Sequence, residues 1–212
     1  MRIRPLPVIF GILWLVIGSA GLWIIFEYEN TPSDMESAPL HWPVSSQIVV
    51  PSGRPVFLMF VHPQCPCTRA SIEELDTLMA SCQNRLETYL LFVRPKAFDV
   101  EWVRSNLWKQ ASGIPGVHLY RDDEGKEAKK FHATVSGQTL LYNEKGRLLF
   151  NGGITGSRGH SGDNKGRDSV ISFVLKGNTK TNRAFVFGCS LFDPKKGTIL
   201  KTLPAIANDL KG

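Results

Sequence analysis

The sequence lacks any block of lysines and arginines interleaved with aromatic residues, which argues against a nucleic-acid interface. Positive charge is only in mild excess, with 25 Lys and Arg against 19 Asp and Glu and a formal net charge of +6. This excess is spread along the chain and favours an acidic partner or an anionic membrane surface. We therefore expect no nucleic-acid partner.

Cysteines are scarce and internal repeats are absent. The chain has four cysteines in 212 residues, and a folded part of roughly 150 residues buries a sufficient core without disulfide staples. No repeat of useful length is present, and the composition is ordinary for a folded protein. These features favour one domain with appendages over a repeat array, a disulfide scaffold or a disordered chain.

One long run without charge stands near the N-terminus, from Val8 to Phe26. Nineteen helical residues reach roughly the thickness of a bilayer's hydrocarbon core. Basic residues precede the run and acidic residues follow it: Arg2 and Arg4 before, and Glu27, Glu29, Asp34 and Glu36 after. The positive-inside rule then places residues 1–7 in the cytoplasm and the rest of the chain across the inner membrane, in the periplasm. A cleaved signal peptide ending near Ala20 is the alternative, and it also exports the domain.

The remaining sequence divides into three parts. Residues 27–46 are polar and rich in proline and serine, which is typical of a flexible linker. Residues 47–192 alternate strand-like and helix-like segments, which indicates an α/β layered domain, and residues 193–212 form a C-terminal tail. We expect strands at residues 55–61, 89–93, 117–120 and 184–187, a hairpin from residues 139–142 and 147–150, and helices at residues 66–80, 99–111, 126–132 and 167–176.

Two cysteines, Cys65 and Cys67, stand one residue apart in HPQCPCTRAS, where a buried strand gives way to a helix. Unpaired backbone N–H groups at a helix start stabilise negative charge. A thiol at that position has a lowered pKa, and the thiolate is the attacking species in disulfide exchange. The intervening Pro66 suits a first helical turn. A structural disulfide between the two is the alternative, but it closes a tiny loop and stabilises little.

The segment VFLMFVHPQCPC…EEL resembles the active-site strand, loop and helix of the thioredoxin superfamily. The hairpin GQTLLYNEKGRLLFNGG is similar to that of membrane-anchored, periplasmic TlpA/ResA-type members. With its CPC site and GGIT-SRGH loop, the chain resembles RedB-type proteins still more closely. The resemblance covers about residues 47–190 and implies a three-layer thioredoxin-like domain with a central mixed sheet. It implies that Cys65 attacks and Cys67 resolves.

Two positions depart from the family pattern. The spacing between Cys65 and Cys67 is one residue shorter than C-x-x-C, so a disulfide between them is expected to be strained and easily reduced. Gln138 stands where the family has a cis-proline that faces the two sulfurs and holds an extended peptide. Its replacement leaves room for a metal or another small ligand beside the sulfurs.

Other residues are candidates for accessory roles. Cys189 has three open interpretations: a partner for Cys82, a third redox thiol near Cys65, or a packed side chain. The glycine-rich stretch of residues 151–169 lacks the order of a phosphate-binding loop. It carries Arg158 and His160, and three interpretations stay open: an anion-binding loop at the start of a helix, a cover for the thiol pair, or a plain surface loop.

A metal site is a further possibility at the same place. His62 precedes the cysteine loop, and thiolates with an imidazole suit Cu(I) or Zn(II). The copper-handling Sco proteins share the fold this chain resembles and use cysteines with a distant histidine. We take Cys65, Cys67 and His160 as the metal-binding hypothesis, with His62 as the alternative histidine.

The leading functional hypothesis is a membrane-anchored thiol–disulfide oxidoreductase that needs no cofactor. Its partners would be the thiols or disulfides of exported proteins and a membrane electron donor. A copper metallochaperone is the second hypothesis, and a peroxiredoxin-like peroxide reductase is the third. The third lacks the Thr-x-x-Cys arrangement of that chemistry, because Pro63 and Gln64 precede Cys65.

Overall fold

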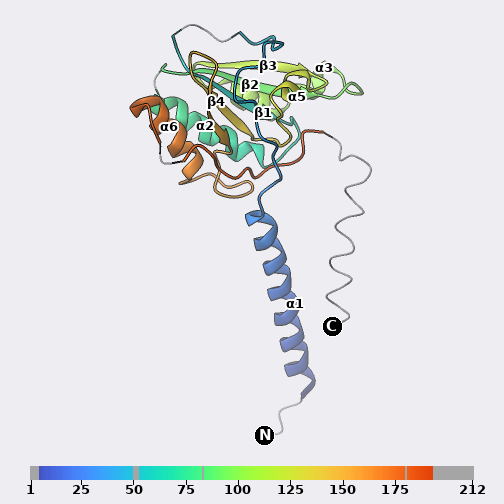
Figure 1. The fold of residues 1–212 in the computed structure, drawn as a ribbon. Coiled ribbons are helices and arrows are strands. Elements are labelled where there is room, and N and C mark those ends of the chain that lie inside the picture. The colour runs from blue at the N-terminus through green and yellow to red at the C-terminus, as the bar shows by residue number, and fades with distance from the viewer. Residues whose placement is uncertain (1–4, 50–52, 83, 180, 193–212) are drawn as a thin grey trace.

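The apolar run near the N-terminus forms one long helix, α1, from Pro5 to Asn30. The computed structural model describes residues 5–49, 53–82, 84–179 and 181–192, and α1 projects away from the remaining elements (Figure 1). Its 26 residues span about 39 Å at 1.5 Å per residue. The apolar window is covered by no other part of the described chain, and the helix is long and apolar enough to cross a membrane. It extends beyond the expected residues 8–26 at both ends.

A five-stranded mixed sheet forms the centre of the domain. Its strands are β1 (Val56–Val61), β2 (Glu87–Arg94), β3 (Val117–Asp123), β4 (Thr139–Tyr142) and β5 (Leu148–Gly152). They lie in the order β3-β2-β1-β4-β5. The first three strands run parallel, while β4 pairs antiparallel with β1 and with β5. The central strand β1 is fully buried, as its continuous apolar sequence VFLMFV requires.

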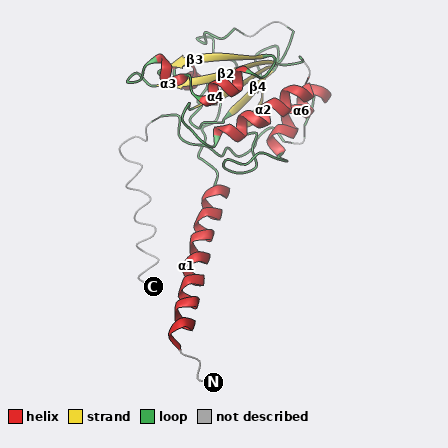
Figure 2. Cartoon of the chain, turned by 180° about the vertical axis from the view of Figure 1, so that it is seen from behind, coloured by secondary structure: helices red, strands yellow, loops and turns green. Residues whose placement is uncertain are grey.

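Helices cover the two faces of this sheet. They are α2 (Thr68–Cys82), α3 (Val100–Val103), α4 (Asn106–Ser112), α5 (Lys126–Lys130) and α6 (Lys165–Lys176). Alternate residues of β1 point to opposite faces, so Phe57 and Met59 pack with residues of α2, α4 and α6. Leu58 and Phe60 pack on the other face with Phe131, just after α5. Seen from behind, α2, α4 and α6 lie in front of the sheet (Figure 2). The expected three-layer architecture with a mixed sheet is confirmed.

Two helix predictions need correction. The helix expected at residues 99–111 is two helices, because Ser105 adopts an extended backbone between α3 and α4. Ser105 is the N-cap residue of α4, although its side chain makes no capping hydrogen bond, and serine is unfavourable inside a helix. Asp99 is the N-cap, as expected, and its side chain accepts from the Trp102 amide at 2.9 Å. The second helix, α2, begins at Thr68 and not at Pro66, which lies in the turn before it.

The segment expected to be a flexible linker, residues 27–46, is instead partly helical and partly packed on the domain. Its first four residues belong to α1. Ser33 then bridges Val186, and the Tyr142 hydroxyl donates to the Pro39 carbonyl at 2.8 Å. The Trp42 ring lies 4.9 Å from that of Phe131. Isolated apolar residues in a polar segment show no period, so the sequence pattern gave no sign that they cover the sheet.

The C-terminal part of the domain differs from expectation in a similar way. Residues 184–187 form no strand; Val186 makes one isolated bridge, and Arg183 makes another with Asn151. The predicted tail, residues 193–212, lies outside the described residues.

A buried carboxylate on α2 holds the glycine-rich loop and the start of α6. Glu74 is 3% exposed and accepts from the Gly162 amide, the Asn164 side chain and the Arg167 guanidinium. Asn164 caps α6 by accepting from the Arg167 amide at 2.8 Å. This network fixes the second half of the loop onto the helix that follows the cysteines.

Replacing this carboxylate by an amide tests the network. We expect Glu74→Gln to lower the free energy of unfolding by about 3 kcal/mol, because the largely buried guanidinium of Arg167 loses its buried counter-charge and keeps only exposed carboxylates nearby. The measurement is urea unfolding of the full chain in detergent, followed by near-ultraviolet circular dichroism. Asp163→Asn is the matched control: this exposed carboxylate lies 3.6 Å from Arg167, and its loss should change stability by less than about 0.5 kcal/mol. Equal effects of the two changes would contradict the account.

Candidate functional site

The turn between β1 and α2 carries the Cys-Pro-Cys sequence. The Cys65 amide donates to the His62 carbonyl at 3.0 Å, and the Cys65 carbonyl accepts from the Thr68 amide at 3.2 Å. Cys65 therefore lies in the last turn before α2, at the end of the central strand. This is the position expected from the sequence, where amide groups not yet engaged in the helix face a sulfur.

Three sulfurs meet at this turn. The Sγ atoms of Cys65, Cys67 and Cys189 lie within 4.8 Å of one another, and those of Cys65 and Cys189 are 2.9 Å apart. Among the described residues, this is the one group of three or more Cys, His, Asp or Glu side chains so arranged. Cys82 lies at the far end of α2, where burial raises the pKa of its thiol to about 11. Of the interpretations open for Cys189, the structure thus favours a place beside Cys65.

An attacking cysteine must be accessible to the partner sulfur, but Cys65 is less exposed than its neighbour Cys67. Cys65 is 1% exposed, whereas Cys67 and Cys189 are half-buried. Cys67 and Cys189 are therefore the more exposed of the three cysteines, and Cys65 is the least exposed.

The thiols differ in charge as well as in exposure. A hydrogen bond from the Cys189 thiol lowers the pKa of Cys65 to about 4, against the opposing effect of burial and with help from Thr68 and two backbone amides. Burial and the adjacent negative charge on Cys65 raise the pKa of Cys67, and Arg158 partly offsets this rise. The pKa of Cys189 is also raised, because its proton is held in the hydrogen bond to Cys65. These pKa shifts favour a thiolate at Cys65 and protonated thiols at Cys67 and Cys189.

Backbone contacts on both sides hold Cys189 in place. Its carbonyl accepts from the Ser136 amide at 2.8 Å. The preceding carbonyl, that of Gly188, accepts from Ser33 Oγ and from Arg158 Nη1, both at 2.7 Å. A Cβ atom at Gly188 would collide with the Ser136 carbonyl oxygen, so the close approach of these two segments requires glycine.

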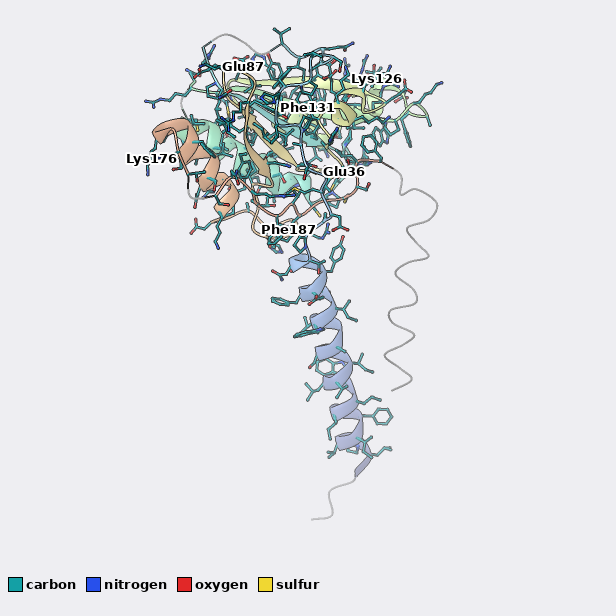
Figure 3. All side chains as sticks on the ribbon, viewed as in Figure 1. Glu36, Glu87, Lys126, Phe131, Lys176 and Phe187 are labelled. Atoms are coloured by element: carbon teal, nitrogen blue, oxygen red, sulfur yellow. The ribbon has the colours of Figure 1, made fainter. Side chains whose placement is uncertain are left out.

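Arg158 joins the end of α1 to the thiol cluster. Its guanidinium lies 4.9 Å from the centre of the Tyr28 ring, its Nε donates to the Tyr28 carbonyl at 3.1 Å, and its Nη2 donates to Ser33 Oγ at 2.9 Å. Its positive charge also lowers the pKa of the Cys67 thiol. Phe187, two residues before Cys189, lines a pocket together with Pro32 and Ser33, which follow α1, and in Figure 3 it is labelled just above the upper end of that helix. The thiols therefore lie on the side of the domain from which α1 projects.

The remaining candidate residues lie outside the cluster. His160 is exposed, and its Nε2 lies 3.4 Å from Glu29 Oε2, so the expected set of Cys65, Cys67 and His160 is not assembled. The third potential metal ligand beside Cys65 and Cys67 is Cys189 and not the histidine of the metal-binding hypothesis. His62 stays at the turn, where its Nδ1 accepts from the Gln64 amide at 3.3 Å.

Gln138, at the position of the family's cis-proline, is fully buried. Its side chain accepts from the Thr134 amide at 3.1 Å and donates to Asn151 at 3.2 Å. It therefore supports the hairpin and the loop before it.

Two hydroxyl residues that the sequence reasoning missed support the cysteine turn. Ser136 Oγ accepts from the His62 amide at 2.8 Å and lies 2.8 Å from Thr68 Oγ1. Thr68 also stabilises the Cys65 thiolate. A threonine at the first position of the helix after the cysteines was the available signal for one of them, whereas Ser136 carries no local signal.

A parallel β1-β2-β3 unit extended by an antiparallel hairpin, with cysteines in the turn between the central strand and the following helix, is the arrangement of a thioredoxin-like fold. No protein-family model and no curated protein matches the sequence.

Solved structures share this architecture. A hypothetical protein from Sinorhizobium meliloti is 17% identical with a TM-score of 0.55, over 76% of this chain and 93% of its own. An uncharacterised conserved protein from Geobacillus kaustophilus is 16% identical with a TM-score of 0.54, over 79% of this chain and 96% of its own. StoA from Bacillus subtilis is 16% identical with a TM-score of 0.44, over 68% of this chain and 98% of its own. Only the first two structures, with TM-scores above 0.5, support a shared fold with this chain.

Titration of the thiolate tests the hydrogen bond between Cys189 and Cys65. In the wild type the Cys65 thiolate should persist as the pH falls until it is protonated near pH 4. In Cys189→Ala the largest stabilising contact is gone, so the thiolate should already be lost at a clearly higher pH. Cys189→Ser keeps a hydroxyl donor and should fall between the two. The measurement is the ultraviolet thiolate absorbance of the reduced chain in a Cys82→Ser background. Identical titrations for the wild type and Cys189→Ala would contradict the assignment.

Proposed function

We propose that this protein is a thiol–disulfide oxidoreductase, anchored by α1 in the cytoplasmic membrane with its thioredoxin-like domain on the outer side. The observation that carries the proposal is the group of three sulfurs within 4.8 Å, at the end of the central strand. A thiol held as a thiolate beside two further thiols is what disulfide exchange requires.

The burial of the sulfurs suggests their order in the reaction. In the oxidised protein, a partner thiolate attacks Cys67, the more accessible sulfur, and the bond between Cys67 and Cys65 breaks. Cys65 leaves as a thiolate, and its low pKa makes it a good leaving group. A second thiol of the partner then attacks the mixed disulfide and releases Cys67, which takes up a proton. The partner loses two electrons and gains a disulfide, and the protein becomes a dithiol.

The same steps in reverse reduce a partner disulfide. In that direction Cys67 makes the first bond and the Cys65 thiolate resolves it. The resemblance to the thioredoxin superfamily implies the opposite order, with Cys65 attacking first. We exchange the attacking and resolving roles of the two cysteines because Cys65 is only 1% exposed. Suitable partners are the thiols and disulfides of exported proteins, together with an electron carrier of the membrane.

Exchange assays on the full chain in detergent test this function. We expect the wild type to accelerate both disulfide formation in reduced, unfolded ribonuclease and insulin reduction. Cys65→Ser should reduce both rates to background, because it removes the thiolate. Cys82→Ser, which alters a buried thiol at the other end of α2, should keep the wild-type rates. Wild-type activity in Cys65→Ser would overturn the proposal.

A copper metallochaperone is the second candidate, supported by the three soft sulfur donors of the same cluster. In this version Cys65, Cys67 and Cys189 hold Cu(I), and His160 takes no part. Tight Cu(I) binding in competition with a chromophoric chelator, lost in Cys189→Ser and kept in His160→Ala, would favour this candidate if exchange activity is absent. Weak binding in the wild type would exclude it.

Membrane anchoring and orientation have their own test. We expect the protein to stay in the membrane fraction after carbonate extraction, because nothing in the described chain covers the apolar residues of α1. The two arginines before the helix should hold its start in the cytoplasm. Protease added to spheroplasts should therefore digest the domain without lysis. Protection of the domain until the spheroplasts are lysed would contradict the orientation.

A further inference from the structure

Of the two thiols near the buried thiolate, Cys189 is in direct contact with it. The Cys65 and Cys189 sulfurs are 2.9 Å apart, across a sequence separation of 124 residues. A disulfide requires this gap to close to about 2.05 Å. Because Cys189 is half-buried and not sealed, a disulfide at this place would keep one sulfur within reach of a partner.

The segment that carries Cys189 is fixed from both sides. The Ser136 amide donates to the Cys189 carbonyl at 2.8 Å, and the Leu191 amide donates to the Thr134 carbonyl at 2.9 Å. The Gly188 amide donates to Ser33 Oγ at 3.3 Å. These contacts come from the loop before β4 and from the segment after α1. The placement of the sulfur against Cys65 is therefore built into the fold.

A disulfide between Cys65 and Cys67 is less favourable than one between Cys65 and Cys189. A disulfide between residues separated by a single proline closes a very small ring, and its preferred geometry is hard to reach. A bridge between Cys65 and Cys189 needs no such small ring, because the fold already holds these two sulfurs 2.9 Å apart. The lower strain favours the longer bridge at equilibrium.

From this geometry, and resting on the proposed oxidoreductase function, we infer that Cys189 is a third exchanging thiol. The stable oxidised form of the protein carries a Cys65–Cys189 disulfide and a free Cys67. Cys67 remains the contact sulfur for the partner, because its attack on Cys65 restores the Cys65–Cys67 disulfide that the partner exchanges with. Cys189 receives the disulfide back when it attacks Cys65 in turn.

The transfer balances within the protein. Starting from a Cys65–Cys67 disulfide, Cys189 loses its proton and attacks Cys65 Sγ. The bond between Cys65 and Cys67 breaks, and Cys67 leaves as a thiolate that takes up a proton. No electrons enter or leave the protein in this step. The positive charge of Arg158, which lowers the pKa of Cys67, stabilises the departing charge.

Mapping the disulfide in the oxidised full chain tests the inference. The protein, in a Cys82→Ser background, is equilibrated with oxidised glutathione in detergent, quenched with acid, alkylated and digested. Because only Pro66 separates Cys65 from Cys67, these two stay on one peptide, whereas Cys189 falls on another. We expect mass spectrometry to find the two peptides joined and the alkyl label on Cys67. A disulfide within the first peptide, with the label on Cys189, would overturn the inference.

Two variants separate the thiol assignment from the proposed function. Cys67→Ser should still form an internal disulfide, whereas Cys189→Ser should form only the Cys65–Cys67 bridge and be reduced more readily by glutathione. If Cys189→Ser exchanges disulfides at the wild-type rate and resists glutathione equally well, the assignment fails and the oxidoreductase function stands. If the joined peptides form but no protein substrate is turned over, the function fails and the assignment stands. The wild-type map decides the matter even if a variant does not fold.

Discussion

The thiolate on Cys65 is the constraint on which the site depends. A buried negative charge without partners is very costly, and in such surroundings a thiol ordinarily keeps its proton. Here the Cys189 thiol, Thr68 and the backbone amides of Cys189 and Cys67 stabilise the charge on the sulfur, and together they hold the pKa of Cys65 well below its usual value. The loop before β4 fixes Cys189 and, through Ser136, contacts Thr68. The surrounding fold thus supplies the hydrogen bonds that keep this charge buried.

The same contacts connect the site to α1. Arg158 donates to carbonyls near the end of α1 and to the Gly188 carbonyl beside Cys189, and its charge lowers the pKa of Cys67. The thiols therefore lie near the end of the apolar helix, and the segment after it helps to build the site. With the membrane arrangement proposed above, the cluster lies close to the membrane surface. This position suits exchange with a membrane-bound electron carrier more than with a distant soluble partner.

Sequence reasoning was most successful where the signal was local. The buried strand β1, the hairpin and the Asp99 cap follow from short patterns, and the turn that carries Cys65 and Cys67 follows from the strand that precedes it. Contacts between distant segments gave no such signal. Cys189 comes to Cys65 only through contacts of its neighbours with Ser33 and with the loop before β4. Tertiary packing alone also places the segment around Trp42 over the sheet. It likewise buries Cys65 more deeply than Cys67.

The reduction potential of the full chain, measured by equilibration with glutathione, tests the central claim most directly. A thiolate stabilised in the reduced form makes the disulfide more oxidising. We therefore predict a two-electron transition that involves Cys65 and lies clearly above the value of thioredoxin, about −270 mV. A transition at or below that value, or one that persists in Cys65→Ser, would contradict the buried thiolate as the basis of the site.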